Sequence, residues 1–565
     1  MSSPALDRRP LRAVRLPALP AARALPAGVA VGLAIGGLLI VSVLLRTTAL
    51  HAGFWIDEGI SVGISSHGFL DIPGVLRLDG SPPLYYLLLH VWMAIFGDGQ
   101  ATTHVLSLGF ALLAIPVAYW AAAGTFGRRA GLCAAILAAV NPFLTYYAQE
   151  TRMYALASLL ALVVAATIVR VFVFRRRAFL PVFSLALAAL MYTHNWGLFL
   201  AVGTVVALVP AWRETSDRRA FARDVVIAYG AVALLYAPWV PSLLFQAAHT
   251  GAPWAVRPSV AAIFGPIAGI LGGETVPLAL LLAVGAGLAT IVKGRPGLAS
   301  AAGEVVATGG EEGEAVAAVR RTAVWVLVAL PLAGMVIAWT ASQLSPAFAS
   351  RYFAVFVGPV LLLAGVGLAH AGRLGVITLA IVCALWFDPR TTKLETKSDA
   401  RLVAAKIKAD VYPGDLVVSI HPEQTPVLHY YLPDGLRYAD SISLVRDPRV
   451  FDWRDALERL RDARPSRVLG SYVSSLRPGQ TLVLVNPIVR ASNWRAPWTE
   501  LVRKRSAQWQ RQADRNPNLV RIGVQPRFGN RSLPRGVRAT LYRKTAAPRD
   551  LAAERRARRT LEQTP

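Results

Sequence analysis

Directly after its first long apolar run, the chain reads Phe54-Trp55-Ile56-Asp57-Glu58-Gly59. Two adjacent carboxylates at the edge of a hydrophobic span are costly to place there, and ionisable groups in such positions are usually functional. In isolation, the pair could equally cap the helix that follows, because acidic residues favour the positive N-terminus of a helix. Residues farther along the chain decide between these two interpretations.

The composition is that of a membrane protein. Of 565 residues, 55% are hydrophobic and only 16% are charged, whereas a soluble protein carries roughly 25% charged residues. The long apolar runs fill 27–388, and most of the charge lies in loops and after residue 388. We therefore predict a mainly α-helical, polytopic membrane protein with a small α/β domain at its C-terminus.

The change in composition predicts four regions. They are a basic N-terminal segment at 1–26, a transmembrane domain at 27–388, a soluble α/β domain at 389–548 and a basic tail at 549–565. The first apolar run is long and lacks an obvious small-residue cleavage site, so we expect a permanent anchor and not a cleaved signal peptide. Cys133 and Cys383 both fall within predicted spans, which argues against a disulfide framework and against a cysteine metal site.

The chain is strongly basic, with a formal net charge of +26. On a soluble chain such a charge would suggest nucleic-acid binding. Here many basic residues form short clusters of the kind that orient membrane helices, and no nucleic-acid motif accompanies them. We expect the lipid bilayer as a partner and no nucleic acid.

The basic clusters predict the topology. Cytoplasmic loops carry an excess of Lys and Arg, and five arginines precede the first span, so the N-terminus is placed in the cytoplasm. Assigning the later clusters to the same side predicts eleven transmembrane helices, near 27–46, 101–123, 130–148, 152–174, 178–194, 197–212, 224–243, 270–291, 322–341, 352–371 and 374–388. The C-terminal domain then lies outside the cytoplasm, in a multi-pass protein of the plasma (inner) membrane.

Two further segments need a separate interpretation. Residues 82–97 are apolar enough to span, but a crossing there would place Arg128-Arg129 and the arginines at 175–177 outside. We therefore predict a helix packed at the outer interface, or re-entrant within the protein. The stretch 296–319 is rich in Ala, Gly and Glu and aperiodic, which indicates a flexible cytoplasmic loop.

The pattern changes after residue 390. Helical spacing is found over Ser398–Ala409 and Thr425–Leu432, and strands are predicted at Leu416–Ile420, Thr481–Val485 and Arg538–Tyr542. This mixture favours a small α/β domain. Its position outside the membrane suggests the hypothesis that it binds a glycan or a protein.

With this topology, nearly all polar residues of interest lie at the outer ends of the helices. They are Asp57, Glu58 and Asp79 in the first outer loop, Glu150 and Arg152 in the second, His194 in the third, and Arg351 and Tyr352 in the fifth. Carboxylates, arginines and aromatic rings at one membrane face are typical of an active site, whereas a transporter places ionisable groups nearer the midplane. Guanidinium groups match phosphate oxygens, and a carboxylate can take a proton from a hydroxyl group.

Three stretches resemble the bacterial GT-C glycosyltransferases. They are Trp55-Ile56-Asp57-Glu58, Asp79-Gly80-Ser81-Pro82-Pro83-Leu84-Tyr85-Tyr86 and Gln149-Glu150-Thr151-Arg152-Met153-Tyr154, and a late Arg351-Tyr352 also fits. The resemblance covers roughly 28–370 and is nearest to the protein mannosyltransferase and aminoarabinose lipid A transferase group. It implies the GT-C architecture, a polyprenyl-phosphate-linked sugar donor and inverting transfer at the outer membrane face. It favours mannose as the sugar and an envelope glycan, glycolipid or protein as the acceptor.

The resemblance also implies residue roles. Asp57 would act as general base, Glu58 would assist it, and Glu150 would fill a second acidic position. The substrate-binding residues are expected to be Arg152, Arg351, His194, Asp79, Tyr352 and Tyr85. The structural alternatives are packing for Tyr85, a local ion pair for Glu150 and Arg152, an interfacial hydrogen bond for His194, contact with lipid headgroups for Arg351 and a turn for Asp79. No metal-ligand spacing is present and no cofactor is required, although Asp57 and Glu150 could together hold a divalent cation.

The chain departs from the resemblance at two positions. His104 stands where relatives often carry arginine, and Ser81 stands where they carry a charged residue, so phosphate contacts expected there must come from elsewhere. Two other functions stay open. A lipid-linked glycan transporter or flippase would need a charged path through the helices, and a non-catalytic scaffold would make Asp57 dispensable.

Overall fold

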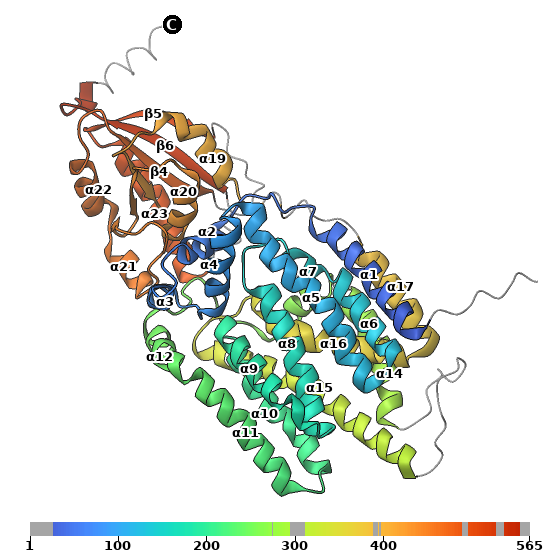
Figure 1. Cartoon of the computed structure of the whole chain (residues 1–565). Coiled ribbons are helices and arrows are strands. Elements are labelled where there is room, and N and C mark those ends of the chain that lie inside the picture. The colour runs from blue at the N-terminus through green and yellow to red at the C-terminus, as the bar shows by residue number, and fades with distance from the viewer. Residues whose placement is uncertain are drawn as a thin grey trace, which may run out of the picture.

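The computed structural model of the chain describes residues 26–273, 275–293, 311–387, 394, 397–488, 495–526 and 536–553. Most of the predicted N-terminal segment and much of the predicted basic tail lie outside these residues. Figure 1 shows a helical bundle with an α/β domain seated on one of its ends.

Helical structure is found at each of the eleven predicted spans. The elements are α1 (Ala27–Arg46), α5 (Gln100–Phe126), α6 (Arg128–Val140) with α7 (Pro142–Tyr147), α8 (Tyr154–Ile168) continued by a π-helical turn (Val169–Val173), α9 (Leu180–Thr193), α10 (Gly197–Glu214), α11 (Arg218–Tyr236), α14 (Thr275–Val292), α15 (Glu311–Leu344), α16 (Ala354–His370) and α17 (Gly372–Trp386). Within the described residues, eight helices are long and apolar enough to cross a membrane. The helices α6, α9 and α17 are shorter than the ~20 residues of a full span.

Two helices extend beyond their predictions. The helix α15 begins at Glu311, so the prediction of a loop over 296–319 is wrong for its last nine residues, and 296–310 lie outside the described chain. Its first turns are rich in Glu and Ala, which favour a helix through the dipole and through propensity. The helix α11 passes through a 3₁₀ turn (Ala237–Trp239) into α12 (Val240–His249), well past the predicted end at residue 243.

The first outer loop forms three short helices, α2 (Ile56–Ser65), α3 (Ile72–Asp79) and α4 (Leu84–Phe96). In Figure 1, α2 and α4 lie between the bundle and the α/β domain. The helix α4 has 13 residues, too few for the ~20 of a span. The helices α6 and α9, found at two predicted spans, are about equally short. The placement of 82–97 at the interface therefore stays a prediction.

The α/β domain contains a six-stranded sheet of order β3-β2-β1-β4-β6-β5. The strands are β1 (Leu416–Ser419), β2 (Arg437–Asp440), β3 (Leu444–Val445), β4 (Thr481–Ile488), β5 (Leu519–Gln525) and β6 (Gly536–Lys544). The inner strands β2, β1 and β4 are parallel, and the other pairings are antiparallel. The three predicted strands are confirmed as β1, β4 and β6, whereas β2, β3 and β5 were not predicted.

Helices cover both faces of this sheet. They are α19 (Ala400–Ile407), α20 (Thr425–Tyr431), α21 (Ala456–Asp462), α22 (Pro465–Ser474) and α23 (Pro497–Asp514), of which α19 and α20 confirm the two predicted helices. Because strand side chains alternate, Val417 packs with α19 and α20, and Val418 packs with α22 and α23. Phe54 and Val62 of the first outer loop join the core on the Val417 side. The membrane domain therefore contributes two side chains to the core of the α/β domain.

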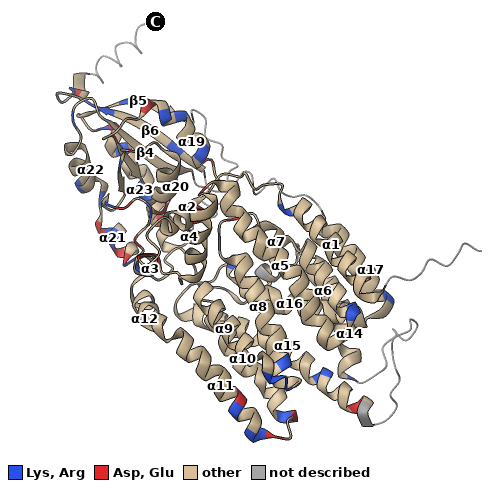
Figure 2. Cartoon of the chain, in the orientation of Figure 1, with Lys and Arg blue, Asp and Glu red and all other residues tan. Residues whose placement is uncertain are grey.

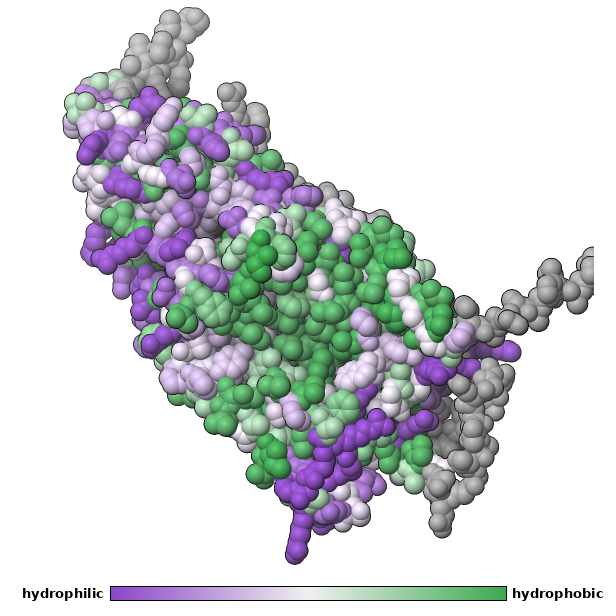
Figure 3. All heavy atoms as spheres, viewed as in Figure 1, coloured by the Kyte–Doolittle hydropathy of each residue, from purple (hydrophilic) through white to green (hydrophobic). Residues whose placement is uncertain are grey.

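Charge and hydropathy divide the molecule into zones. Figure 2 shows Lys and Arg at the end of the bundle away from the α/β domain and on that domain itself, with few charges between. On the face drawn in Figure 3, a broad hydrophobic surface covers the same intermediate region. This is the distribution expected when a bilayer surrounds the bundle.

Candidate active site

A cavity of about 780 Å³ lies between the α/β domain and the ends of the helices next to it. Its lining includes six of the residues proposed from sequence: Asp57, Asp79, Arg152, His194, Arg351 and Tyr352. They come from α2, the end of α3, the turn before α8, the residue after α9 and the 3₁₀ turn before α16. The fold thus gathers into one cavity polar side chains that are far apart in the sequence.

Asp57 lies between two arginines. Its Oδ2 atom is 3.9 Å from Nε of Arg351, and its side chain keeps 15% of its surface exposed. The guanidinium of Arg351 also lies 4.9 Å from the ring of Trp254, which fixes it by a cation–π contact. Nη1 of Arg152 donates to the carbonyl oxygen of Asp57 at 3.1 Å and to Oγ of Ser61 at 2.9 Å.

His194 and Asp79 are two further polar residues that the membrane domain contributes to the cavity lining. Nδ1 of His194 accepts the N–H of Trp196 at 3.1 Å, so the proton of the neutral ring is on Nε2. Burial raises the pKa of Asp79, and a hydrogen bond with Ser81 and the charge of Arg152 partly oppose this rise. The wall therefore offers cationic and neutral hydrogen-bond donors beside the carboxylates.

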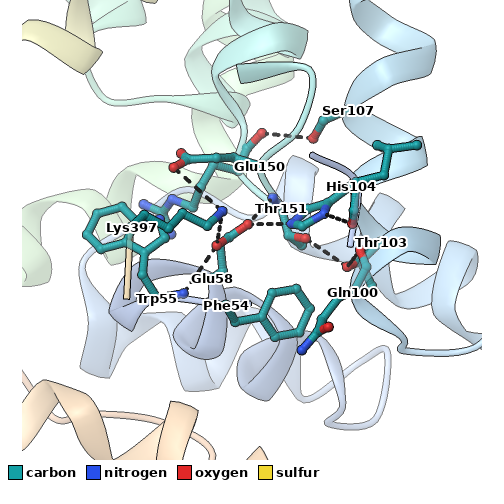
Figure 4. Close-up of polar contacts among 12 residues, drawn as sticks. Phe54, Trp55, Glu58, Gln100, Thr103, His104, Ser107, Glu150, Thr151 and Lys397 are labelled. Carbon is teal, nitrogen blue, oxygen red and sulfur yellow. Dashed lines mark hydrogen bonds and ion pairs between the residues drawn. The ribbon is translucent and has the colours of Figure 1, made fainter. Parts of the chain in front are cut away.

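Glu58 is not in the lining and is fully buried. Figure 4 shows its carboxylate inside a ring of donors. Oε2 lies 2.6 Å from Nζ of Lys397 and accepts the N–H of Trp55 at 3.2 Å. Oε1 lies 2.7 Å from Nε2 of His104 and accepts the N–H of Thr151 at 2.9 Å. Glu58 therefore caps its own helix and anchors three other segments.

Lys397 and His104 stabilise the charged form of Glu58. Burial alone would raise its pKa, but Lys397 and His104 outweigh burial and hold the pKa of Glu58 well below its usual range. Nδ1 of His104 lies 2.7 Å from the carbonyl oxygen of Leu50, so both ring nitrogens face acceptor oxygens, an arrangement that an imidazolium satisfies. His104 stands where the resemblance implies an arginine, and its side chain is directed at Glu58 and not at the cavity.

Glu150 and Tyr85 also lie outside the cavity lining. Oε1 of Glu150 is 3.9 Å from Nζ of Lys397, and the hydroxyl of Tyr85 lies 3.2 Å from Oγ of Ser107. Both side chains are buried. The structure does not bring Glu150 and Asp57 into one cavity, and the described residues form no cluster of three or more metal-ligating side chains.

Comparison with known proteins gives the fold. No protein-family model and no curated protein sequence matches the chain. Among solved structures, apo ArnT from Cupriavidus metallidurans matches with a TM-score of 0.56 and 16% identity, over 81% of this chain and 93% of that one. ArnT bound to undecaprenyl phosphate matches with a TM-score of 0.52 and 14% identity, over the same 81% and 93%. The mycobacterial arabinofuranosyltransferase AftD matches with a TM-score of 0.51 and 15% identity, over 93% of this chain and 40% of that one.

These neighbours are GT-C glycosyltransferases. The chain has the GT-C fold. Within this fold, the cavity lies beside α2, the helix that carries Asp57 and Glu58 in its first turn.

Two glycines let the α/β domain approach α2 closely. A Cβ atom at Gly59 would lie 2.6 Å from the Cβ of Val427, and one at Gly63 would overlap the carbonyl oxygen of Arg449. Next to them, the N–H of Phe54 donates to the hydroxyl of Tyr431 at 2.6 Å. The helix that carries Asp57 therefore contacts both domains.

Sequence analysis missed five residues around this site: Lys397, His421, Glu423, Trp453 and Thr499, of which the last four line the cavity. For His421 a signal existed, because it directly follows the predicted strand Leu416–Ile420, and ligands bind beyond the carboxyl ends of parallel strands. No local pattern marks Lys397, whose partners are set only by the tertiary fold.

Proposed function

We propose that this protein is a membrane glycosyltransferase that moves a sugar from a polyprenyl phosphate to a hydroxyl group of an envelope acceptor. The observation that carries the proposal is the position of Asp57, which faces a cavity at the outer ends of the helices beside Arg152 and Arg351. The GT-C fold and the undecaprenyl phosphate bound by ArnT support a lipid-linked donor. The motif resemblance favours mannose.

The arginines suit the donor phosphate. Arg351 and Arg152 present guanidinium groups in the cavity, and charge-assisted hydrogen bonds to phosphate are roughly twice as strong as neutral ones. The Nε2–H group of His194 adds a neutral donor. Together they would stabilise the negative charge that grows on the phosphate as the sugar leaves.

Asp57 suits the acceptor side of the reaction. The acceptor oxygen forms a bond to the anomeric carbon while the bond from that carbon to the phosphate oxygen breaks. The electron pair of the broken bond leaves with the polyprenyl phosphate, and the acceptor proton passes to the Asp57 carboxylate. A single displacement of this kind inverts the anomeric configuration. General-base assistance is commonly worth about 10²–10⁴ in rate.

The distribution of charge favours an enzyme over a lipid-linked glycan transporter. A transporter needs ionisable groups near the midplane of the membrane, whereas the described charges gather at the two ends of the bundle. The polar cavity lies at one of these ends, next to the α/β domain.

The decisive experiment is the exchange Asp57→Asn in full-length protein reconstituted into liposomes with radiolabelled polyprenyl-phosphate-mannose. We expect sugar release and transfer to fall about 10²–10⁴-fold, because the amide cannot accept the proton. Asp71→Asn is the matched control, since Asp71 lies exposed in the same outer loop and outside the cavity lining. Full activity of Asp57→Asn would refute the assigned base.

A further inference from the structure

The central strand β1 ends at a crevice. It pairs in parallel with β2 on one side and with β4 on the other. In open parallel sheets, the loops that follow such neighbouring strands diverge, and ligands bind in the crevice outside the carboxyl ends. Strand β1 ends at Ser419, and the loop that follows it carries His421 and Glu423.

This loop is fixed by hydrogen bonds. Oγ of Ser419 donates to the carbonyl oxygen of His421 at 2.7 Å, and the N–H of Gln424 donates to the same oxygen at 2.9 Å. Nε2 of His421 lies 2.6 Å from Oε1 of Glu423, which also accepts the indole N–H of Trp498 at 3.0 Å. The imidazole and the carboxylate therefore form an ordered pair.

The pair belongs to the same cavity as Asp57 and Arg351, although it comes from the other domain. Trp453 and Thr499 accompany it, and the described lining from the α/β domain contains no Lys or Arg. The arginines come from the membrane domain, as does Asp57. The α/β side of the cavity thus has a carboxylate and, in the described lining, no Lys or Arg. Such a surface disfavours phosphate and suits an uncharged molecule rich in hydroxyl groups.

We propose that this wall is the acceptor subsite, and that His421 and Glu423 hold neighbouring hydroxyl groups of a sugar acceptor. The inference rests on the proposed function, because it assigns the second substrate of the same reaction. The carboxylate accepts from hydroxyl groups and the imidazole can accept or donate, while the ring of Trp453 packs against the apolar face of the sugar. At about 780 Å³, the cavity is near the upper end of the ~300–1,000 Å³ typical of ligand pockets, with room for two sugars.

His421 and Glu423 act in this proposal as positioning residues. They orient an acceptor hydroxyl toward Asp57 and do not take its proton. Their loss should therefore raise the KM for the acceptor more than it lowers kcat. It should also spare hydrolysis of the donor, in which water replaces the acceptor.

The kinetic test uses the full-length protein in nanodiscs with radiolabelled polyprenyl-phosphate-mannose. Acceptor probes are octyl α-mannoside and a Ser/Thr-containing peptide, and release of free mannose is measured without either. We expect His421→Ala and Glu423→Gln to raise the KM for octyl α-mannoside at least tenfold and to change mannose release less than twofold. Glu458→Gln, an exposed carboxylate on α21, is the control and should match the parent protein.

A binding test separates this inference from the proposed reaction. Saturation-transfer NMR with methyl glycosides of mannose, glucose and arabinofuranose should give signals with the parent protein and with Asp57→Asn. The signals should be lost in the double variant of His421→Ala and Glu423→Gln. Glu423→Gln alone keeps the shape of the side chain, so weakened binding in that variant, with an unchanged unfolding temperature, excludes misfolding as the cause.

The outcomes are distinct. Sugar binding that depends on His421 and Glu423, with no transfer by the parent protein, would overturn the proposed function and support the subsite. Four results would each overturn the subsite. In the kinetic test they are transfer that neither substitution changes, equal loss of transfer and hydrolysis, and transfer to the peptide alone. In the binding test it is an absence of glycoside signals.

Discussion

Adjacent carboxylates at positions 57 and 58 serve different purposes because neighbouring helical residues point about 100° apart. Asp57 faces the cavity, and Glu58 faces the buried side chains of Lys397 and His104. Glu58 caps the helix, and Asp57 is left for the proposed catalytic role. The sequence motif could suggest Asp57, but the environment of Glu58 depends on Lys397, which only the folded chain brings there.

Removal of Lys397 should destabilise the protein. Lys397→Met would leave Glu58 and Glu150 close to each other without their shared cation, and breaking a buried ion pair costs about 3–5 kcal/mol. We expect a clear fall in the unfolding temperature of the purified full-length protein and reduced activity. Lys406→Met, an exposed site on α19, should change neither. Unchanged stability of Lys397→Met would show that the pair contributes nothing.

Arg351 should be sensitive even to lysine. Arg351→Lys keeps the charge but loses the planar fork and the contact with Trp254. With one charge-assisted hydrogen bond worth about 1.5–3 kcal/mol, kcat/KM for the lipid-linked donor should fall about 10–100-fold. Arg257→Ala, at an exposed position in the segment after α12, is the control. Parent-like kinetics of Arg351→Lys would exclude a phosphate contact through the guanidinium fork.

At the scale of elements, long apolar helices were predictable and short or polar elements were not. The spans follow from apolar runs and basic loops, and β1, β4 and β6 follow from apolar strands between turns. Strand β2, Arg437-Tyr438-Ala439-Asp440, has charged ends and no apolar run, because its neighbours in the sheet and not its own sequence hold it in place. The cavity wall beyond β1 depends on how the two domains pack, which local patterns do not encode.

The close contact at α2 predicts a strong effect of a single methyl group. Gly63→Ala would drive a Cβ atom into the backbone of Arg449, and overpacking typically costs about 1–3 kcal/mol. We expect a lower unfolding temperature and reduced transfer. Gly74→Ala is the matched control, because α3 leaves open space there and the exchange should stabilise the helix by roughly 0.5–1 kcal/mol. Equal unfolding temperatures of Gly63→Ala and Gly74→Ala would contradict the close packing of α2 against the α/β domain.

Asp440, at the end of β2, should make stability depend on pH. Burial raises its pKa to about 6, against hydrogen bonds from the N–H groups of Ser443 and Ile442 that lower it. Between about pH 4 and pH 6 the folded chain then binds more protons than the unfolded chain, so the free energy of unfolding decreases as pH rises through this window. Above about pH 6 the contribution is constant.

Asp440→Asn should remove this dependence. The amide oxygen can still accept both backbone hydrogen bonds, and the buried charge is gone. Thermal unfolding of the full-length variant should match the parent protein near pH 4 and exceed it at pH 7.5. Asp434→Asn, an exposed carboxylate in the same domain, should follow the parent protein at both values. A variant less stable than the parent at pH 7.5 would contradict a destabilising charge.

At the scale of the whole molecule, the charge zones predict an orientation. The end of the bundle away from the α/β domain should face the cytoplasm, because basic loops stay inside. After replacement of Cys133 and Cys383 by Ser, a membrane-impermeant thiol reagent should label Glu458→Cys in intact cells and Arg176→Cys only after permeabilisation. Both positions are exposed. The reverse labelling pattern would place the cavity on the cytoplasmic side.

The insertion of Lys397 between Glu58 and Glu150 also sets where chimeric proteins can be joined. The end of α17 looks like a natural boundary between the two domains. Lys397, which pairs with Glu58 and Glu150 of the membrane domain, nevertheless lies beyond it, close to the start of α19. A C-terminal domain grafted from another protein of this fold, beginning at α19, must therefore leave Lys397 in place. It must also leave Gly59 and Gly63 of α2 unchanged. The same constraint applies in evolution. The membrane domain and the α/β domain should be exchanged between proteins only together with Glu58, Lys397 and the residues that contact Gly59 and Gly63.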